Sequence, residues 1–103
     1  MANMGKLMKQ AQQMQAKLST LQKELETREF ESSTGGGMVS VKVNGKQELL
    51  EISIDKEVVD PNDVEMLQEL VKTAINQAMK ESQDSVQNAM NKVTGGLSIP
   101  GLF

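Results

Sequence analysis

Apolar residues recur at helical spacing along the N-terminal part of the chain. Seven of them stand alternately three and four positions apart, which is heptad spacing: Met4, Leu7, Ala11, Met14, Leu18, Leu21 and Leu25. No proline or glycine follows Gly5 in this stretch, so we predict a long helix over residues 3–27. Few complementary charges flank the apolar positions, and we therefore expect this helix to pack on its own domain or on a second copy rather than as an autonomous coiled coil.

The periodicity changes to two after residue 30. Two runs alternate between apolar and polar side chains, as half-buried strands do, with the apolar members Val39, Val41, Val43, Leu50, Ile52 and Ile54. Asn44-Gly45 between the runs is a strong hairpin signal. With a short strand before them, the pattern predicts a three-stranded antiparallel sheet over residues 30–34, 38–43 and 47–55.

Three consecutive glycines, Gly35 to Gly37, precede the first valine run. A phosphate-binding loop requires a helix N-terminus after it, whereas here a strand follows and the Lys-Ser/Thr ending is missing. We expect these glycines to allow positive φ or a close backbone approach where the chain enters the sheet.

Helical spacing returns in the C-terminal part of the chain. Asp60-Pro61 has the form of an N-cap followed by proline at the first helical position, and Gly95-Gly96 is the expected stop. Between them an apolar face is formed by Val64, Leu67, Val71, Ile75, Ala78 and Met79, continued more thinly to Val93. We predict a second long helix over residues 61–94 and a tail over residues 95–103.

These elements make a single α+β domain over residues 1–103, and its helices are too long for a compact globule. At 1.5 Å per residue they span roughly 37 and 50 Å, against a radius of gyration near 13 Å for a compact chain of this size. The chain also has two Phe, no Trp or Tyr and eight Met. We therefore expect a homodimer whose seam or core includes Leu7, Met14, Leu18, Leu21, Val41, Ile52, Leu67 and Val71.

The residue types available leave little scope for catalysis. Histidine, cysteine and tyrosine are absent from the sequence, so acid, base and nucleophile candidates reduce to carboxylates, lysines and hydroxyls. The densest carboxylate cluster, between Asp55 and Glu65, lacks the spacing and the glycine of a calcium loop. We expect no enzyme activity, metal, cofactor or small-molecule substrate. Without a signal peptide or membrane span in the sequence, we expect a cytoplasmic protein.

The charge is distributed unevenly along the chain. Although the net charge is −3, residues 1–23 contain four lysines and no acid, at Lys6, Lys9, Lys17 and Lys23. Residues 51–69 contain seven acids against Lys56. A charged helix face is usually only solvated, but this face has one sign and is interleaved with glutamines, which also suits contact with phosphates.

Five stretches in order resemble the YbaB/EbfC family of nucleoid-associated proteins: MGKLMKQAQQMQ, GGGMVSVKVNGK, ISID, DVEMLQELVKTAINQAM and GGLSIPGLF. The resemblance implies an α+β homodimer in which the sheets join at the centre and the long helices project like the arms of tweezers. It also implies binding to double-stranded DNA with a change in DNA conformation, an effect on nucleoid organisation and gene expression, and a location in the bacterial nucleoid.

The placement of DNA contacts on the first and last helices, as the resemblance implies, makes the four N-terminal lysines the main candidates. Lys80 and Lys92 are secondary candidates on the last helix. Without a compact base-reading set of residues, we expect low sequence specificity. The alternative is a protein-interaction module that uses the apolar helix faces and the tail, with only indirect DNA association, and the isoelectric point near 4.9 favours this view.

Overall fold

A computed structural model describes residues 3–93 of the chain. Along the sequence, the elements are α1 (Met4–Thr27), β1 (Glu29–Thr34), β2 (Val39–Asn44), β3 (Leu49–Ile54), the 3-10 helix η1 (Lys56–Val58) and α2 (Val64–Val93). The predicted α+β architecture of helix, three-stranded sheet and helix is confirmed. The predicted tail over residues 95–103 lies outside the described residues.

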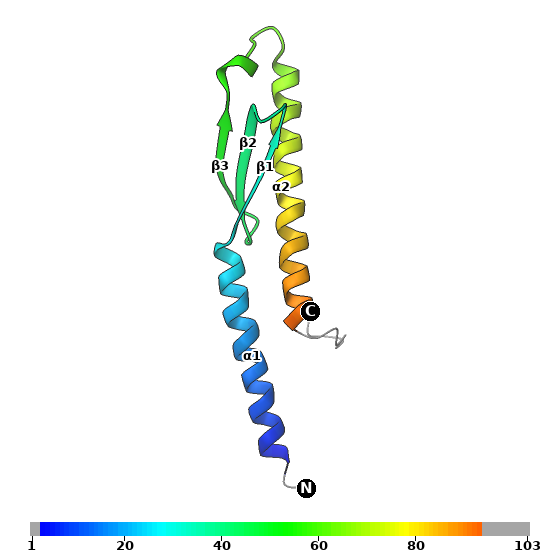
Figure 1. Ribbon diagram of the computed structural model, residues 1–103. Coiled ribbons are helices and arrows are strands. Elements are labelled where there is room, and N and C mark those ends of the chain that lie inside the picture. Colours follow the sequence, from blue (N-terminus) through cyan, green and yellow to red (C-terminus); the bar gives the residue numbers. More distant parts are fainter. Residues whose placement is uncertain (1–2, 94–103) are drawn as a thin grey trace.

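The molecule is elongated, because α1 projects well beyond the sheet instead of folding back over it (Figure 1). The principal extents are 75 × 21 × 18 Å and the radius of gyration is 20.0 Å. A compact chain of this length has a radius of gyration near 13 Å. Much of the apolar surface of α1 is therefore left without cover from the other residues between 3 and 93.

The sheet has the order β1-β2-β3, with both pairs antiparallel, and α2 lies across one face (Figure 1). Val39, Val41 and Val43 alternate inward from the central strand and are buried against α2. Ala74 and Ala78 are fully buried on the facing side of α2, since small side chains allow the helix to approach the sheet closely. This two-layer contact forms the core.

Two hydroxyls of β1 form hydrogen bonds to the first half of α2. Thr34 Oγ1 donates a hydrogen bond of 2.8 Å to the carbonyl of Leu70, and Ser32 Oγ donates one of 3.0 Å to Gln77 Oε1. Because α2 packs mainly on β1 and β2, it covers two strands of the three and β3 lies at an uncovered edge.

The three consecutive glycines form the turn between β1 and β2. Gly35, Gly36 and Gly37 all have positive φ, at 61°, 67° and 93°. Side chains with a Cβ adopt this conformation at a cost, so glycine suits all three positions. The prediction of positive φ is confirmed.

Most element boundaries lie within one residue of those expected, and two element starts differ by more. The helix predicted from residue 61 begins at Val64, because Asp60 Oδ1 accepts from the Asn62 N–H in a local turn and Asp63 Oδ1 caps the helix by accepting from the Met66 N–H. The strand predicted from residue 47 begins at Leu49, since the hairpin loop is longer than a two-residue turn.

Candidate nucleic-acid interface

The four lysines predicted to contact DNA in the N-terminal region all lie exposed on α1, at Lys6, Lys9, Lys17 and Lys23. The first acidic residue of the helix is Glu24. Within residues 3–93, none of these four ammonium groups has a carboxylate within ion-pair distance; the ion pairs of the structure involve Lys42, Lys46 and Lys72. The projecting helix thus presents uncompensated positive charge over most of its length.

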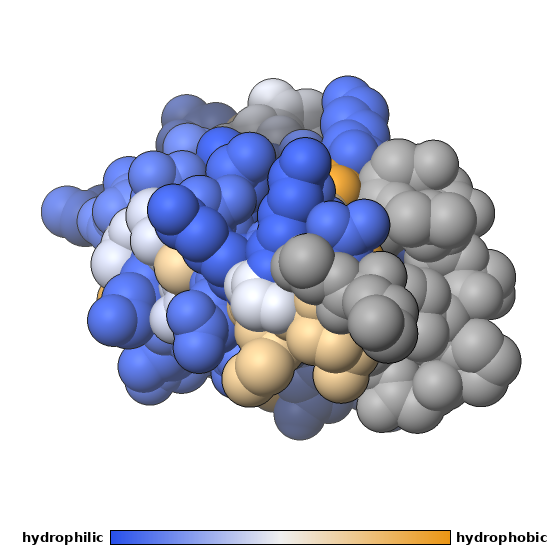
Figure 2. Space-filling view, turned by 90° about the horizontal axis from the view of Figure 1, so that it is seen from below, coloured by the Kyte–Doolittle hydropathy of each residue, from blue (hydrophilic) through white to orange (hydrophobic). Residues whose placement is uncertain are grey.

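Among the described residues, the apolar side of α1 is buried near its C-terminal end and exposed toward its N-terminal end. Leu25 is 1% exposed, and Leu18 and Leu21 are partly buried. Met4 and Leu7, by contrast, are 70% and 58% exposed. The view from the α1 end shows hydrophilic side chains over much of the coloured surface, with an apolar patch below the centre (Figure 2). In the heptad repeat, Lys9 and Lys23 lie on the side of the helix opposite the apolar positions from Met4 to Leu25.

The two secondary lysines on α2 have different surroundings. Lys80 lines a surface hollow together with Glu81 and Asp84, whose carboxylates reduce the positive potential around it. Lys92 lies in the last turn of α2, where a cation also interacts favourably with the helix dipole. A role for either lysine in DNA contact stays a prediction.

The uncovered edge of the sheet continues into an apolar groove. Every residue of β3 is exposed, including Leu50, Ile52 and Ile54. Beside it, a groove of about 510 Å³ is lined by Ile54, Leu67, Gln68, Val71, Lys72, Ile75 and Asn76. Edge backbone and apolar side chains without cover are typical of a surface completed by another chain.

The predicted seam residues therefore separate into two groups. Val41 is a buried core residue, and Leu18, Leu21, Leu67 and Val71 are partly buried. The exposed members are Leu7, Met14 and Ile52. The described chain brings the β3 edge and the α2 groove together, but it leaves the first half of the α1 seam apart from both.

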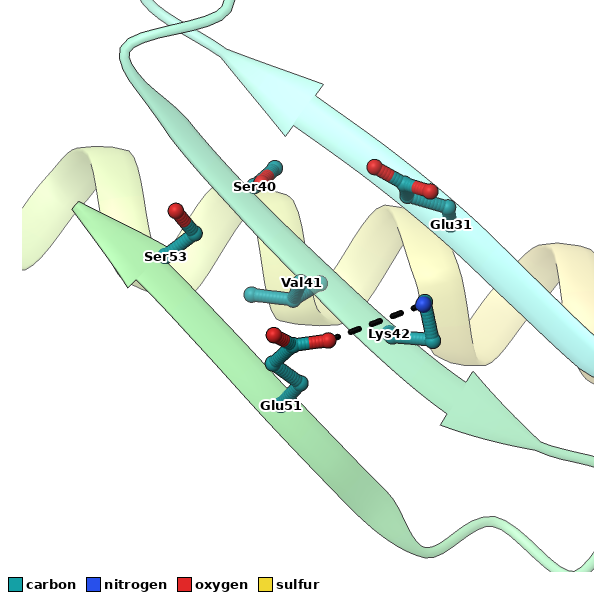
Figure 3. A pocket seen from close by; sticks show the side chains of 6 residues that line it. All are labelled: Glu31, Ser40, Val41, Lys42, Glu51 and Ser53. Carbon is teal, nitrogen blue, oxygen red and sulfur yellow. Dashed lines mark ion pairs between the residues drawn. The ribbon is translucent and has the colours of Figure 1, made fainter. Parts of the chain in front are cut away.

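The face of the sheet opposite α2 is acidic. Lys42 Nζ lies 3.5 Å from Glu29 Oε1 and 3.6 Å from Glu51 Oε2, and the charges of Glu29 and then Glu51 raise the pKa of Lys42. Glu31 lies opposite Lys42 in the register of β1 and β2, and its side chain lines the same hollow as Lys42 and Glu51 (Figure 3). Three carboxylates around one ammonium group make this face repel phosphates.

Two further observations limit what the described residues can do. No group of three or more histidine, cysteine or acidic side chains in residues 3–93 converges as metal ligands. Over the same residues, no helix combines the length and apolar character needed to cross a membrane.

Sequence reasoning missed a polar cluster between the β2–β3 loop and α2, formed by Asn44, Gln47 and Ser82. One signal for it exists. Ser82 falls at helical spacing after Ala78, on the side of α2 where the surrounding positions are apolar. A serine at such a position predicts a buried hydrogen bond.

Together, the fold and this surface define an elongated α+β protein with a projecting basic helix and an uncovered apolar edge. Residues 1–97 match the YbaB/EbfC DNA-binding family, and the chain belongs to this family. The resemblance inferred from the five sequence stretches is thereby confirmed. The family is defined by DNA binding and is not an enzyme family.

Individual relatives agree with this assignment. A nucleoid-associated protein of Clostridium novyi is 54% identical over 101 residues, covering 98% of this chain and 89% of the relative. A nucleoid-associated protein of Clostridium kluyveri is 52% identical with the same coverage of both chains. The crystal structure of an uncharacterized protein from Helicobacter pylori has a TM-score of 0.76 at 27% identity, covering 92% of this chain and 100% of that one.

Proposed function

We propose that this protein binds double-stranded DNA as a homodimer in the bacterial nucleoid, holding the duplex by its phosphates with low sequence specificity and altering its conformation. The observation that carries the proposal is the one-signed lysine face of α1, which is exposed and projects away from the acidic sheet. Ammonium groups on flexible stems neutralise phosphates without reading bases, so affinity and sequence preference are separate properties here.

The electrostatics of this arrangement direct DNA to the arms. The acidic outer face of the sheet and the acids between Asp55 and Glu69 repel a duplex, whereas α1 attracts it. In a homodimer the four α1 lysines occur twice, which makes about four to eight phosphate contacts available. Each neutralised phosphate contributes about −0.9 to the slope of log affinity against log salt, so we expect a slope between roughly −4 and −7.

The homodimer is supported by the apolar surfaces that remain exposed in the part of the chain from residue 3 to residue 93. The β3 edge offers unpaired backbone groups along Leu49–Ile54, and the adjoining α2 groove offers apolar side chains. A second copy supplies both complements at once if the two β3 edges and grooves meet about a two-fold axis. The protein-interaction alternative uses the same apolar surfaces, but membership of a DNA-binding family does not favour it.

The test is fluorescence anisotropy with duplexes of unrelated sequence at several salt concentrations, with the molecular mass in solution measured in parallel. We expect a dimer that binds all the duplexes with a steep negative salt slope. Lys9→Glu should weaken binding strongly, whereas Lys56→Glu, which makes the same charge change on η1, should alter it little. A dimer that ignores DNA at low salt, or equal effects of the two variants, would overturn the proposal.

A further inference from the structure

We propose that the loop joining β2 and β3, residues 45–48, acts as a joint that sets the direction in which α1 projects from the sheet. Gln47 and Ser82 are then positioning residues for α1, the arm that carries the main candidate DNA-binding lysines. The role in DNA binding rests on the proposed function, whereas the mechanical role does not. The loop lies where the C-terminal end of α1 meets the sheet, beside the path of α2 (Figure 1). It touches both helices that carry the candidate DNA-binding lysines.

The loop is anchored to α2 through one buried hydroxyl. Ser82 is fully buried, and its Oγ donates a hydrogen bond of 2.8 Å to the backbone carbonyl of Asn44. The same oxygen accepts a hydrogen bond of 2.8 Å from Gln47 Nε2. A single hydroxyl therefore ties both the end of β2 and the loop residue Gln47 to the middle of α2, and its bond to Asn44 is buried away from competing water.

The loop itself is held in one shape by its own hydrogen bonds. Asn44 Oδ1 accepts from the backbone N–H groups of Lys46 and Glu48, at 2.9 and 3.0 Å, and Asn44 Nδ2 donates to Glu48 Oε1 at 2.8 Å. Gln47 adopts φ 67°, a left-handed conformation that is unfavourable for a residue with a long side chain. Such a conformation persists where surrounding contacts impose it, and here they include the bond to Ser82.

On its opposite side, the loop packs closely against the C-terminal end of α1. A Cβ at Gly45 would overlap the backbone carbonyl of Leu25, so only glycine allows this close approach. Lys46 Nζ lies 4.0 Å from Glu26 Oε2, which adds an exposed charge contact to the same helix end. The loop is thus packed between the last turn of α1 and the middle of α2.

A small rotation at this contact displaces the far, N-terminal end of α1 by a large distance. All described residues of α1 before Leu18 are exposed, so within residues 3–93 the direction of the helix is set at its C-terminal end. A helix of 24 residues is about 36 Å long, and a change of about 10° at its base moves its tip by about 6 Å. That displacement approaches two base-pair steps of about 3.4 Å along a DNA strand. Loosening the joint should therefore spread the positions of the arm lysines.

Spin labels can measure the arm directly, because the chain contains no cysteine. Gln12→Cys on α1 and Asn88→Cys on α2 place two labels at exposed positions of one chain. Doubly labelled chains are diluted with excess unlabelled parent protein, so the double electron–electron resonance signal reports the α1–α2 distance within one chain, whatever the oligomeric state.

Four substitutions in this labelled protein test the joint. Ser82→Ala and Gln47→Ala should broaden the distance distribution, Ser82→Thr should restore it by keeping the hydroxyl, and Gly45→Ala should shift its mean. Ser85→Ala, on the same helix, is the matched control and should leave the distribution unchanged. If Ser82→Ala fails to fold, the distance distribution of Gln47→Ala tests the proposal instead, because Gln47 is a partly exposed loop residue whose replacement should leave the core intact. Folded joint variants with the parent distribution would overturn the proposal.

Measuring DNA affinity as a function of salt distinguishes whether Ser82 positions α1 or helps to contact DNA. Ser82→Ala should weaken binding several-fold while leaving the salt slope unchanged, because every lysine is still available to neutralise a phosphate. A reduced slope with an unchanged distance distribution would contradict positioning. If the parent protein binds no DNA, the proposed function fails while the distance measurement still decides whether the joint sets the direction of α1.

Discussion

Val41 and Ile52 are paired neighbours on β2 and β3, yet Val41 is 2% exposed and Ile52 is 43% exposed. Residues paired across adjacent strands point to the same face of the sheet. The difference arises because α2 packs over β1 and β2 and leaves β3 uncovered. The α2-facing side of the sheet therefore forms part of the core at β2 and remains exposed to a second chain at β3.

This difference predicts opposite effects of substitution at the two positions. Val41→Ala should lower the free energy of unfolding by roughly 2 kcal/mol, because it removes buried methyl groups from the core. Ile52→Asp should leave the folded chain intact but convert the proposed dimer to monomer. Chemical denaturation and sedimentation equilibrium measure the two effects. Ser53→Asp, on the acidic face, is the control; a dimeric Ile52→Asp protein would place the interface elsewhere.

Leu18 tests the packing of α1. It is partly buried on the apolar side of the helix, so Leu18→Asp places a carboxylate among apolar neighbours without a partner. We expect dissociation of the proposed dimer or a clear loss of thermal stability, measured by sedimentation and by circular dichroism. Ser19→Asp, at the exposed neighbouring position, should have little effect. A Leu18→Asp dimer as stable as the parent would contradict the packing of this face.

The lysines of the two helices should differ in their contribution to DNA binding. Lys17→Ala should reduce the magnitude of the salt slope by about 1 for each phosphate that the protein no longer neutralises. Lys80→Ala should change it less, because Glu81 and Asp84 line the same hollow and oppose a phosphate there. Anisotropy titrations at several salt concentrations compare the variants. Equal changes would assign Lys80 the same role as Lys17.

The ion pairs of Lys42 predict a defined response to pH. Glu29 and then Glu51 raise the pKa of Lys42 above its usual 10.5. Because the folded-state pKa is the higher one, the stabilisation is fully present below pH 10.5 and is lost as the pH rises through the raised value. Glu29→Gln should lower the pKa, measured by NMR titration of the Lys42 side chain. Glu26→Gln should not; a Lys42 pKa unchanged by Glu29→Gln would assign the shift to another cause.

The fold was predictable from local patterns to a large extent. The three–four spacing from Met4 to Leu25 predicted α1, and the alternation around Val41 predicted the sheet, because each pattern reflects the geometry of its own element. The start of α2 was predicted wrongly. Asp60 and Asp63 are both suitable caps, and only the backbone shows that Asp60 closes a turn while Asp63 caps the helix.

The candidate site was predictable only in part. The lysine face of α1 follows from spacing along one helix, since no other element is needed to form it. The contact of Ser82 with Asn44 joins residues 38 positions apart, so no local pattern contains it. The same holds for Gly45, whose close approach to Leu25 depends on the meeting of a helix end and a loop.

The distribution of charge along the 75 Å molecule makes the chain electrically polar. The lysines lie on α1, which forms one end of the molecule, and the segment joining β3 to α2 lies at the opposite end (Figure 1). This segment, which includes η1, contains Asp55, Glu57, Asp60 and Asp63. The field of a polyanion turns such a molecule before contact, with the positive end leading. Encounters with DNA would begin already aligned, so this protein should associate faster than its net charge of −3 suggests.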